Sequence, residues 1–389
     1  MHDSRLRILL LSTEFPPFIE GGLGRHVSDL SRFLSQEGHR VTVLTLHKEN
    51  KRETEYKHDC RIIRTIPPKE FFKDRIEWSL NVNFAFIQEA VSLNEEFDII
   101  HSHDWLTANA GIYLSKIMNI PLVSTIHATE KGRKGKITSA IEKAIHHLES
   151  ELITSSSSII VCSNQMKEEV LNQFSLEPSK LSIIHNGIDP KNFEIPSSAK
   201  HILKKYHFQN PYLFTMGRFV EEKGIHYLIE AFAKIHKKWP DLYLIIAGKG
   251  PWIENYKTII EKYHIQKRVI FTGFIDELER NILLQNAIAS VYPSYYEPFG
   301  IVALESLMMK TPLIVSDKGA WTEWIKDQQN GFIFSYVGSQ RLDDTIQFVI
   351  KHTDLAKQVG QKGYETVMND FQWKDLVHTV IAVYKHVLK

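Results

Sequence analysis

Short apolar segments alternate with amphipathic helical segments along nearly the whole chain, and this alternation constrains the fold most strongly. In the first half, the apolar runs are rich in Ile, Leu and Val and fall at 5–12, 39–46, 60–66, 97–101, 120–126, 158–162 and 181–184. They show little period-two alternation, which is typical of parallel strands covered on both faces. Helical patterns lie between them, for example at 24–37, 78–96, 104–118 and 164–174. This order predicts an α/β fold with a doubly wound parallel sheet.

A second series of the same kind follows a turn cluster at 184–190, which contains Asn-Gly and Asp-Pro. Its strand-like runs fall at 211–216, 242–247, 268–272, 289–292, 312–315 and 331–334. Two successive series indicate two Rossmann-like domains, and the length of 389 residues is enough for both. The tail, 339–389, has the pattern of three consecutive helices.

Composition excludes several classes of protein. The formal net charge is +1, so nothing suggests nucleic acid as a main partner. The two cysteines, Cys60 and Cys162, are far apart and in no C-x-x-C pair, which argues against a disulfide framework and fits a reducing compartment. The first apolar run is too short for a signal peptide, and no run approaches the ~20 apolar residues of a membrane span. We expect a soluble, cytoplasmic protein.

The first strand-like run leads into a glycine-containing loop that carries Gly21, Gly22 and Gly24. Glycines let backbone N–H groups approach a phosphate, and the start of the following helix adds partial positive charge. The alternative is a loop that only needs positive φ angles. The spacing is not G-x-G-x-x-G, and the second strand lacks the acidic residue that would hold a ribose, so an NAD-binding fingerprint is missing. A Walker A pattern is also absent from the sequence.

Two further strand-like runs end in histidines, at the edge where open α/β sheets place their sites. One reads His101-Ser-His103-Asp104-Trp105, and the other ends at His127. A zinc site at His101, His103 and Asp104 is disfavoured, because no third cluster of metal-type ligands accompanies them. Asp104 could equally cap the following helix. A single strand-end histidine is more often structural, but two in one domain favour a cleft.

In the second half, two loops carry charged residues at the ends of predicted strands. Arg218 and Lys223 lie in a glycine-bounded loop, where two cations can converge on a diphosphate, although each could also be a solvated surface charge. Glu297 and Glu305 flank a Pro-x-Gly turn that starts a helix, and the N–H groups at that start can face a phosphate.

Together these segments resemble the retaining glycosyltransferases of family four, which have the GT-B fold and include glycogen synthases and sucrose-phosphate synthases. The motifs occur in the family's order over essentially the whole chain: Gly21-Gly22, the H-x-H-D-W segment, His127, the N-G-I-D junction at 186–189, G-R-x4-K-G at 217–224 and E-x7-E at 297–305. The resemblance implies an N-terminal acceptor-side domain at 1–190, a C-terminal donor-side domain at 191–370 and a C-terminal helix at 371–389 that packs back on the first domain. The two domains would face a central cleft.

The resemblance also implies a function and roles for the motif residues. The chain would be a retaining hexosyltransferase that moves a sugar, glucose as first choice, from a UDP- or ADP-sugar to a hydroxyl of a glycan, lipid or small molecule. The catalytic residues would be His127, Arg218, Lys223 and Glu297. The donor would be bound by Gly21, Gly22, Asp104, Phe299, Gly300, Ile301 and Glu305.

No metal or other cofactor is expected. Transfer from a nucleotide sugar develops negative charge on the departing phosphate, and two cations with a helix N-terminus can stabilise it without a metal. The sequence has no D-x-D motif of the kind that holds the metal in many GT-A enzymes. One departure from bacterial glycogen and starch synthases stands in the first loop. Their K-x-G-G motif is here Ile19-Glu20-Gly21-Gly22, which counts against a strict bacterial glycogen synthase.

A basic segment after His127, with Lys131, Arg133 and Lys134, is a candidate site for the acceptor or a phosphate, or else a solvated loop. It permits at most peripheral contact with an anionic membrane. Two alternatives remain open on the same fold: a nucleotide-sugar epimerase, and an inactive nucleotide-sugar-binding protein. The short chain argues against a phosphorylase, and the missing fingerprint against an NAD-dependent dehydrogenase.

Overall fold

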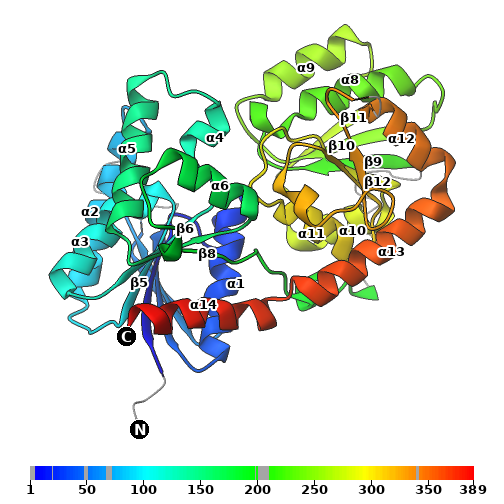
Figure 1. Cartoon of the computed structure of the whole chain (residues 1–389). Helices are drawn as coiled ribbons and strands as arrows, with labels where there is room; N and C mark the ends of the chain where they lie inside the picture. The colour runs from blue at the N-terminus through cyan, green and yellow to red at the C-terminus, as the bar shows by residue number, and fades with distance from the viewer. Residues whose placement is uncertain are drawn as a thin grey trace. The chain divides into compact units, whose positions relative to one another are not determined.

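The computed structural model describes residues 5–19, 21–47, 51–66, 72–197, 199, 210–338 and 341–389, so Glu20 of the first glycine loop lies outside the described residues. The chain divides into two compact units (Figure 1). The first comprises Met1–Gly187 together with Trp373–Lys389, and the second comprises Ile188–Gln372. Each unit has its own sheet and its own buried core.

The first unit is built on a sheet that has eight strands in the described part of the chain, in the order β3-β4-β2-β1-β5-β6-β7-β8. The strands are β1 (Arg7–Leu11), β2 (Arg40–Leu46), β3 (Glu53–Lys57), β4 (Cys60–Thr65), β5 (Ile99–His103), β6 (Leu122–Ile126), β7 (Ser158–Val161) and β8 (Leu181–Ile183). All pairs are parallel except β3 with β4. Residues of β1, β5, β6 and β7 are almost all buried, as their continuous apolar runs predict.

Strand β3 is the one element of this sheet that the apolar pattern does not indicate. Its sequence, Glu-Thr-Glu-Tyr-Lys, is polar and it lies at the sheet edge, mostly exposed. It pairs antiparallel with β4 through a turn at His58 and Asp59, which have φ angles of 52° and 60°. Two successive residues with positive φ are typical of a tight hairpin turn. An edge strand has only one neighbour, so it needs no continuous apolar run.

Helices cover both faces of this sheet. They are α1 (Gly22–Gln36), α2 (Arg75–Ser92), α3 (Ala108–Met118), α4 (Glu130–Lys134), α5 (Ala140–Ser155), α6 (Asn164–Gln173) and α14 (Trp373–Val387), with short 3-10 turns η1 (Trp105–Thr107) and η2 (Pro178–Lys180). Helices α2, α3 and α5 pack together. Helix α14, at the C-terminal end of the chain, packs against α1 (Figure 1). Trp373, Val377 and Tyr384 of α14 join the core formed by α1 and the strands.

The second unit has a parallel sheet with six strands among the described residues, in the order β11-β10-β9-β12-β13-β14. These are β9 (Tyr212–Met216), β10 (Tyr243–Ala247), β11 (Val269–Gly273), β12 (Ala289–Tyr292), β13 (Leu313–Ser316) and β14 (Phe332–Phe334). The helices are α8 (Ile225–Ile235), α9 (Ile253–Lys262), α10 (Glu277–Asn286), α11 (Ile301–Met308), α12 (Leu342–Lys351) and α13 (Thr353–Asp370). Among its described residues the unit also has the 3-10 turns η3 (Pro190–Phe193), η5 (Glu221–Lys223) and η6 (Ala320–Glu323).

The predicted α/β class with two doubly wound sheets is confirmed, as is the succession of three helices in the tail. No helix in the described part of the chain combines the length and the apolar character that a membrane crossing needs.

Candidate active site

In the first unit, the predicted site residues follow the two strands at which the strand order reverses. Strand β1 lies next to β5, with β2, β4 and β3 on one side and β6, β7 and β8 on the other. Chain connections leave these two strands in opposite directions, and the crevice at their carboxyl ends is where open α/β sheets bind ligands. The glycine loop follows β1, and Asp104 follows β5 directly. His127 comes after the next strand, β6.

The glycine loop leads directly into α1. Gly21 is the N-cap residue, with extended backbone at φ −155°, and Gly22 is the first helical residue. A Cβ atom built at Gly21 would meet no other atom within 4 Å, so packing inside the unit does not demand glycine there. The Gly21 N–H donates to Oε2 of Glu14 at 3.0 Å. A carboxylate of the same unit therefore occupies this backbone donor.

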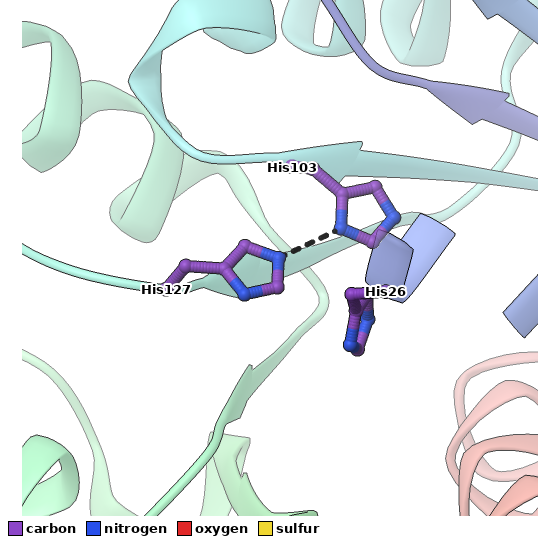
Figure 2. A group of neighbouring side chains, drawn as sticks. All are labelled: His26, His103 and His127. Atoms are coloured by element: carbon purple, nitrogen blue, oxygen red, sulfur yellow. Dashed lines mark hydrogen bonds between the residues drawn. The ribbon is translucent and has the colours of Figure 1, made fainter. Parts of the chain in front are cut away.

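Four histidine rings from three segments of the first unit lie close together. His101 and His103 come from β5, His127 follows β6, and His26 comes from α1, with neighbouring ring centroids 4.3 to 5.5 Å apart. Figure 2 shows His26, His103 and His127, with the hydrogen bond that joins Nδ1 of His103 to Nε2 of His127 at 3.2 Å. Sequence reasoning missed His26, although it stands on the apolar stripe of α1, four residues before Leu30.

Burial controls the charge of these imidazoles. It lowers the pKa of His26, His101 and His103 well below the ordinary value, and neighbouring histidines contribute to the same shift. Burial, with a smaller effect of Arg133, lowers the pKa of His127 to about 3. All four rings are therefore neutral near pH 7, and each can donate one hydrogen bond and accept another.

His101 is fixed as a structural residue of the cluster. Its Nδ1 lies 2.6 Å from the hydroxyl of Tyr384, and its Nε2 lies 2.7 Å from the hydroxyl of Thr125. Both ring nitrogens are thus engaged, so His101 has no ring nitrogen left for a metal. The three side chains that the sequence offered for a zinc site, His101, His103 and Asp104, do not form a group with the spacing of metal ligands; His103 instead lies with His26 and His127.

Asp104 positions His127 rather than capping the following helix. It is buried, and its backbone has a φ angle of 58°, in the left-handed region. Oδ1 of Asp104 accepts the backbone N–H of His127 at 2.7 Å. The structure gives no side-chain cap to the turn at Trp105–Thr107. The carboxylate thus ties the end of β5 to the residue that follows β6.

The basic segment is helical. Lys131, Arg133 and Lys134 all lie on α4, which begins with Thr129 accepting the N–H of Gly132 and ends at Gly135 with φ 72°. Lys131 and Lys134 are exposed, whereas Arg133 turns back toward Glu130, with the two charged groups 4.0 Å apart. Only two residues lie between His127 and the start of α4, so this helix is attached directly to the histidine cluster.

In the second unit, the strand order reverses between β9 and β12, and both predicted charged loops leave these strands. The loop after β9 carries Arg218 and Lys223, and the loop after β12 carries Glu297. Gly224 has a φ of 64°, and a Cβ there would lie 1.9 Å from the carbonyl oxygen of Pro293. Glycine is therefore required for the two loops to pack against each other.

The structure brings Lys223 and Glu297 into direct contact. Nζ of Lys223 donates to Oε2 of Glu297 at 2.6 Å, and the hydroxyl of Ser294 lies 3.5 Å from the same oxygen. The side chains of Lys223 and Glu297 are 23% and 10% exposed, so the pair is mostly shielded from water. Arg218, at the start of the same loop as Lys223, is partly buried.

The turn that precedes α11 is held by aromatic packing. Gly300 is the N-cap residue with a φ of 93°, and Ile301 is the first helical residue. A Cβ at Gly300 would lie 2.7 Å from the fully buried ring of Trp321. Phe299 is also buried and packs on Trp324 and Phe371. This packing fixes the start of α11 close to Glu297.

Glu305 lies farther along α11 and is buried beside Arg280 of α10. Nη1 of Arg280 donates to Oε1 of Glu305 at 2.8 Å, and the two side chains are only 2% and 3% exposed. The Arg280 guanidinium also contacts the amide oxygen of Asn281 and the ring of Phe193. Sequence reasoning missed Arg280, because nothing in its local pattern indicates a partner 25 residues later.

Comparisons with known proteins find related sequences that cover nearly the whole chain. The family described as glycosyltransferase family 4 matches residues 20–192, and the family described as glycosyl transferases group 1 matches residues 200–366. A glycogen synthase of Mycobacterium tuberculosis is 32% identical, over 97% of this chain and 94% of its own length.

Two solved structures have a similar fold. The sucrose-phosphate synthase of Thermosynechococcus elongatus has a TM-score of 0.85 at 23% identity, over 98% of this chain and 99% of the other. HepE of Anabaena, solved in complex with UDP-glucose, has a TM-score of 0.76 at 18% identity, over 99% of both chains.

Proposed function

The chain belongs to the GT-B glycosyltransferases of family 4, and we propose that it moves glucose from a UDP- or ADP-sugar to a hydroxyl acceptor. We further propose that transfer retains the configuration of the anomeric carbon and needs no metal ion. The donor proposal draws on HepE, which was solved with UDP-glucose, and the preference for glucose also on the glycogen synthase relative.

The observation that carries this proposal is the contact of Lys223 with Glu297 beside the start of α11, at the switch point of the second sheet. When the bond from the anomeric carbon to the phosphate oxygen breaks, negative charge grows on the leaving diphosphate. An ammonium group and a helix N-terminus fixed at one place stabilise that charge without reorganising during the reaction. In the proposed mechanism Lys223 and Arg218 bind the diphosphate.

The loop around α11 would bind the rest of the donor. The N–H groups of Phe299, Gly300 and Ile301 would face the phosphates, and Glu297 would accept hydrogen bonds from hydroxyls of the sugar. Glu305 would accept from the ribose, which requires that Arg280 leaves one of its oxygens available. Glu297 would then have two neighbours, the sugar and Lys223.

The first unit would supply the remaining contacts. We propose that the backbone at Gly21 and Gly22 admits the distal phosphate of the donor, which enters the open space at Gly21 and displaces the Glu14 carboxylate from the Gly21 N–H. A neutral His127 would donate or accept a hydrogen bond at the donor sugar, with Asp104 holding its backbone. Lys131, Arg133 and Lys134 on α4 are proposed to bind the acceptor. Such a basic helix suits a phosphorylated sugar, the class of product for which the sucrose-phosphate synthase is named.

A thermal-shift panel tests the donor proposal. Purified protein is melted with UDP, ADP, GDP and NAD, and with the glucose conjugates of the three diphosphates. A ligand that binds only the folded state raises the melting temperature. We expect a shift with UDP or ADP compounds that is lost in Lys223→Ala. A shift only with NAD, or with none of these compounds, would contradict the proposal.

A product assay separates the remaining alternatives. Incubation with the donor alone would convert it if the protein were an epimerase, whereas a transferase needs an acceptor such as a glucan or a sugar phosphate. Binding of the donor without conversion of any acceptor or donor would favour an inactive binding protein. Addition of EDTA should not lower transfer if no metal is required.

A further inference from the structure

Three of the clustered histidines are placed as ligands of a metal would be. His26, His103 and His127 come from three separate elements, and one ring nitrogen of each lies within 4.8 Å of the others (Figure 2). They are the one group of three metal-type side chains with this spacing among the described residues. Three imidazoles from different elements are a common ligand set for zinc.

The hydrogen bond of His26 fixes which of its nitrogens is available. Nδ1 of His26 lies 2.7 Å from Oδ1 of Asn186, an amide oxygen that can only accept. Nδ1 therefore carries the proton, and Nε2 carries a lone pair. This Nε2 is buried and has no hydrogen-bond partner. A ring whose far N–H is held by an oxygen is the usual arrangement of a metal-binding histidine, because that contact fixes tautomer and orientation.

His103 and His127 add a second unusual feature. Their facing nitrogens, Nδ1 and Nε2, share a single proton across 3.2 Å, and Nε2 of His103 is also buried without a partner. Lone pairs left unused in a buried place cost free energy, and a cation would remove that cost.

Access is possible from one side. His26 and His103 are buried, whereas His127 keeps partial exposure and lies in the segment between β6 and α4. An ion entering past His127 would meet all three rings. Cys60 and Cys162 are both buried away from this group, so the available donors are imidazoles alone. Such a set suits Zn²⁺, Co²⁺, Ni²⁺ or Cu²⁺ better than Mg²⁺ or Ca²⁺, which prefer oxygen ligands.

We propose that His26, His103 and His127 form a binding site for a divalent transition-metal ion of the Zn²⁺ type. The transfer reaction does not require this ion. A bound ion holds the ring of His127 and keeps it from the donor sugar, so the metal inhibits transfer reversibly. The inhibition rests on the proposed function of His127, whereas the binding of the ion does not.

The binding test uses the full, untagged chain after treatment with EDTA and removal of the chelator. Co²⁺ is titrated and followed by its visible absorption, and Zn²⁺ is then added as competitor. We expect saturation at one ion per chain, displacement by Zn²⁺, and no response to Mg²⁺. In His26→Gln and in His103→Gln the affinity should fall at least tenfold, whereas His226→Gln, in the second unit, should bind as the unaltered chain does.

A measurement on the unaltered protein does not depend on whether the variants fold. X-ray absorption at the zinc edge of the unaltered protein should give three imidazole nitrogens in the first coordination shell. Fewer than three, a lack of saturation, or equal binding by all variants would overturn the proposal. Binding without inhibition of transfer would leave the metal site standing and would instead contradict the role of His127.

Discussion

Nζ of Lys223 lies 2.6 Å from Oε2 of Glu297, although 74 residues separate them in the chain. The contact joins the two loops that leave β9 and β12, and Gly224 allows their close approach. A lysine held by a carboxylate keeps its place before any ligand arrives. Such preorganisation is what stabilisation of a transition-state charge requires.

Replacing Lys223 by Ala should therefore lower kcat/KM for transfer about 100- to 1,000-fold, the range found when one preorganised electrostatic group is removed. Steady-state kinetics with a UDP- or ADP-sugar donor would measure the change. Lys257→Ala is the matched control, because Lys257 forms an exposed pair with Glu254 on α9. A Lys223→Ala variant with unchanged kcat/KM would remove the leaving-group role from this residue.

The buried pair of Arg280 and Glu305 predicts a large effect on stability. Arg280→Met leaves the carboxylate of Glu305 buried without this guanidinium, and loss of one partner of a buried pair costs about 3–5 kcal/mol of unfolding free energy. Urea unfolding would measure the loss. Replacing both residues, Arg280→Met with Glu305→Leu, should recover most of it, whereas Lys257→Met should change stability by less than ~0.5 kcal/mol. Equal stability of the Arg280 variant and the unaltered chain would show that the pair contributes little.

Glu149 of α5 predicts a pH dependence of stability. Burial raises its pKa to about 8, although Oε1 accepts the N–H of Glu130. The folded state therefore keeps the proton from about pH 4.5 to about pH 8, while the unfolded chain releases it. Because the folded state binds more protons, stability falls as the pH rises through this window, by up to ~1.4 kcal/mol per pH unit.

Glu149→Gln imitates the protonated acid, so it should be more stable than the unaltered chain at pH 8, by an amount that shrinks toward pH 4.5. Its amide can also donate to Nδ1 of His146, which is buried and has no hydrogen-bond partner. Thermal unfolding over this pH range would measure the difference. Glu142→Gln is a control for which the stability change should have the opposite sign, so this variant should be less stable than the unaltered chain. The reason is that hydrogen bonds from Ser139 and Thr138 lower the pKa of Glu142 to about 2. A constant difference between Glu149→Gln and the unaltered chain would contradict the raised pKa.

The sequence identified residues whose position depends on local pattern, and it missed residues whose position depends on contacts between distant parts of the chain. His127 follows directly on a recognisable strand, and Gly21 and Lys223 lie in the loops that follow two others. Parallel strands bring their carboxyl ends to one edge of a sheet. The local pattern was therefore enough to predict that each of them lies at this edge of its sheet. Asp104 was found in the same way, but its bond to the backbone of His127 depends on the pairing of β5 with β6.

Other contacts have no local signal. Tyr384 meets His101 across 283 residues, and only the packing of α14 on the first unit places it there. Strand β3 was missed because a polar edge strand carries no continuous apolar run. The sequence does carry a signal for His26, because a histidine stands on the otherwise apolar buried stripe of α1. That pattern alone does not distinguish a core histidine from a ligand.

Gly187 predicts how sensitive the docking of α14 is to a single methyl group. A Cβ at Gly187 would lie 2.8 Å from the indole of Trp373, the first residue of α14, which is 1% exposed. The φ angle of Gly187 is not positive, so alanine meets a steric clash there and no backbone strain. Overpacking of this kind costs about 1–3 kcal/mol, so Gly187→Ala should unfold at correspondingly lower urea concentration.

The same substitution should also disturb the histidine cluster, because the ring of Trp373 lies 5.1 Å from that of His26. Gly187→Ala combined with Trp373→Leu should regain part of the stability if the clash with the indole is the cause. Gly21→Ala is the matched control, since a Cβ there meets nothing within 4 Å, and its stability should equal that of the unaltered chain. Its affinity for the donor, however, should fall if a phosphate approaches the backbone of Gly21. A Gly187→Ala chain as stable as the unaltered one would mean that α14 shifts to accept the methyl group without cost.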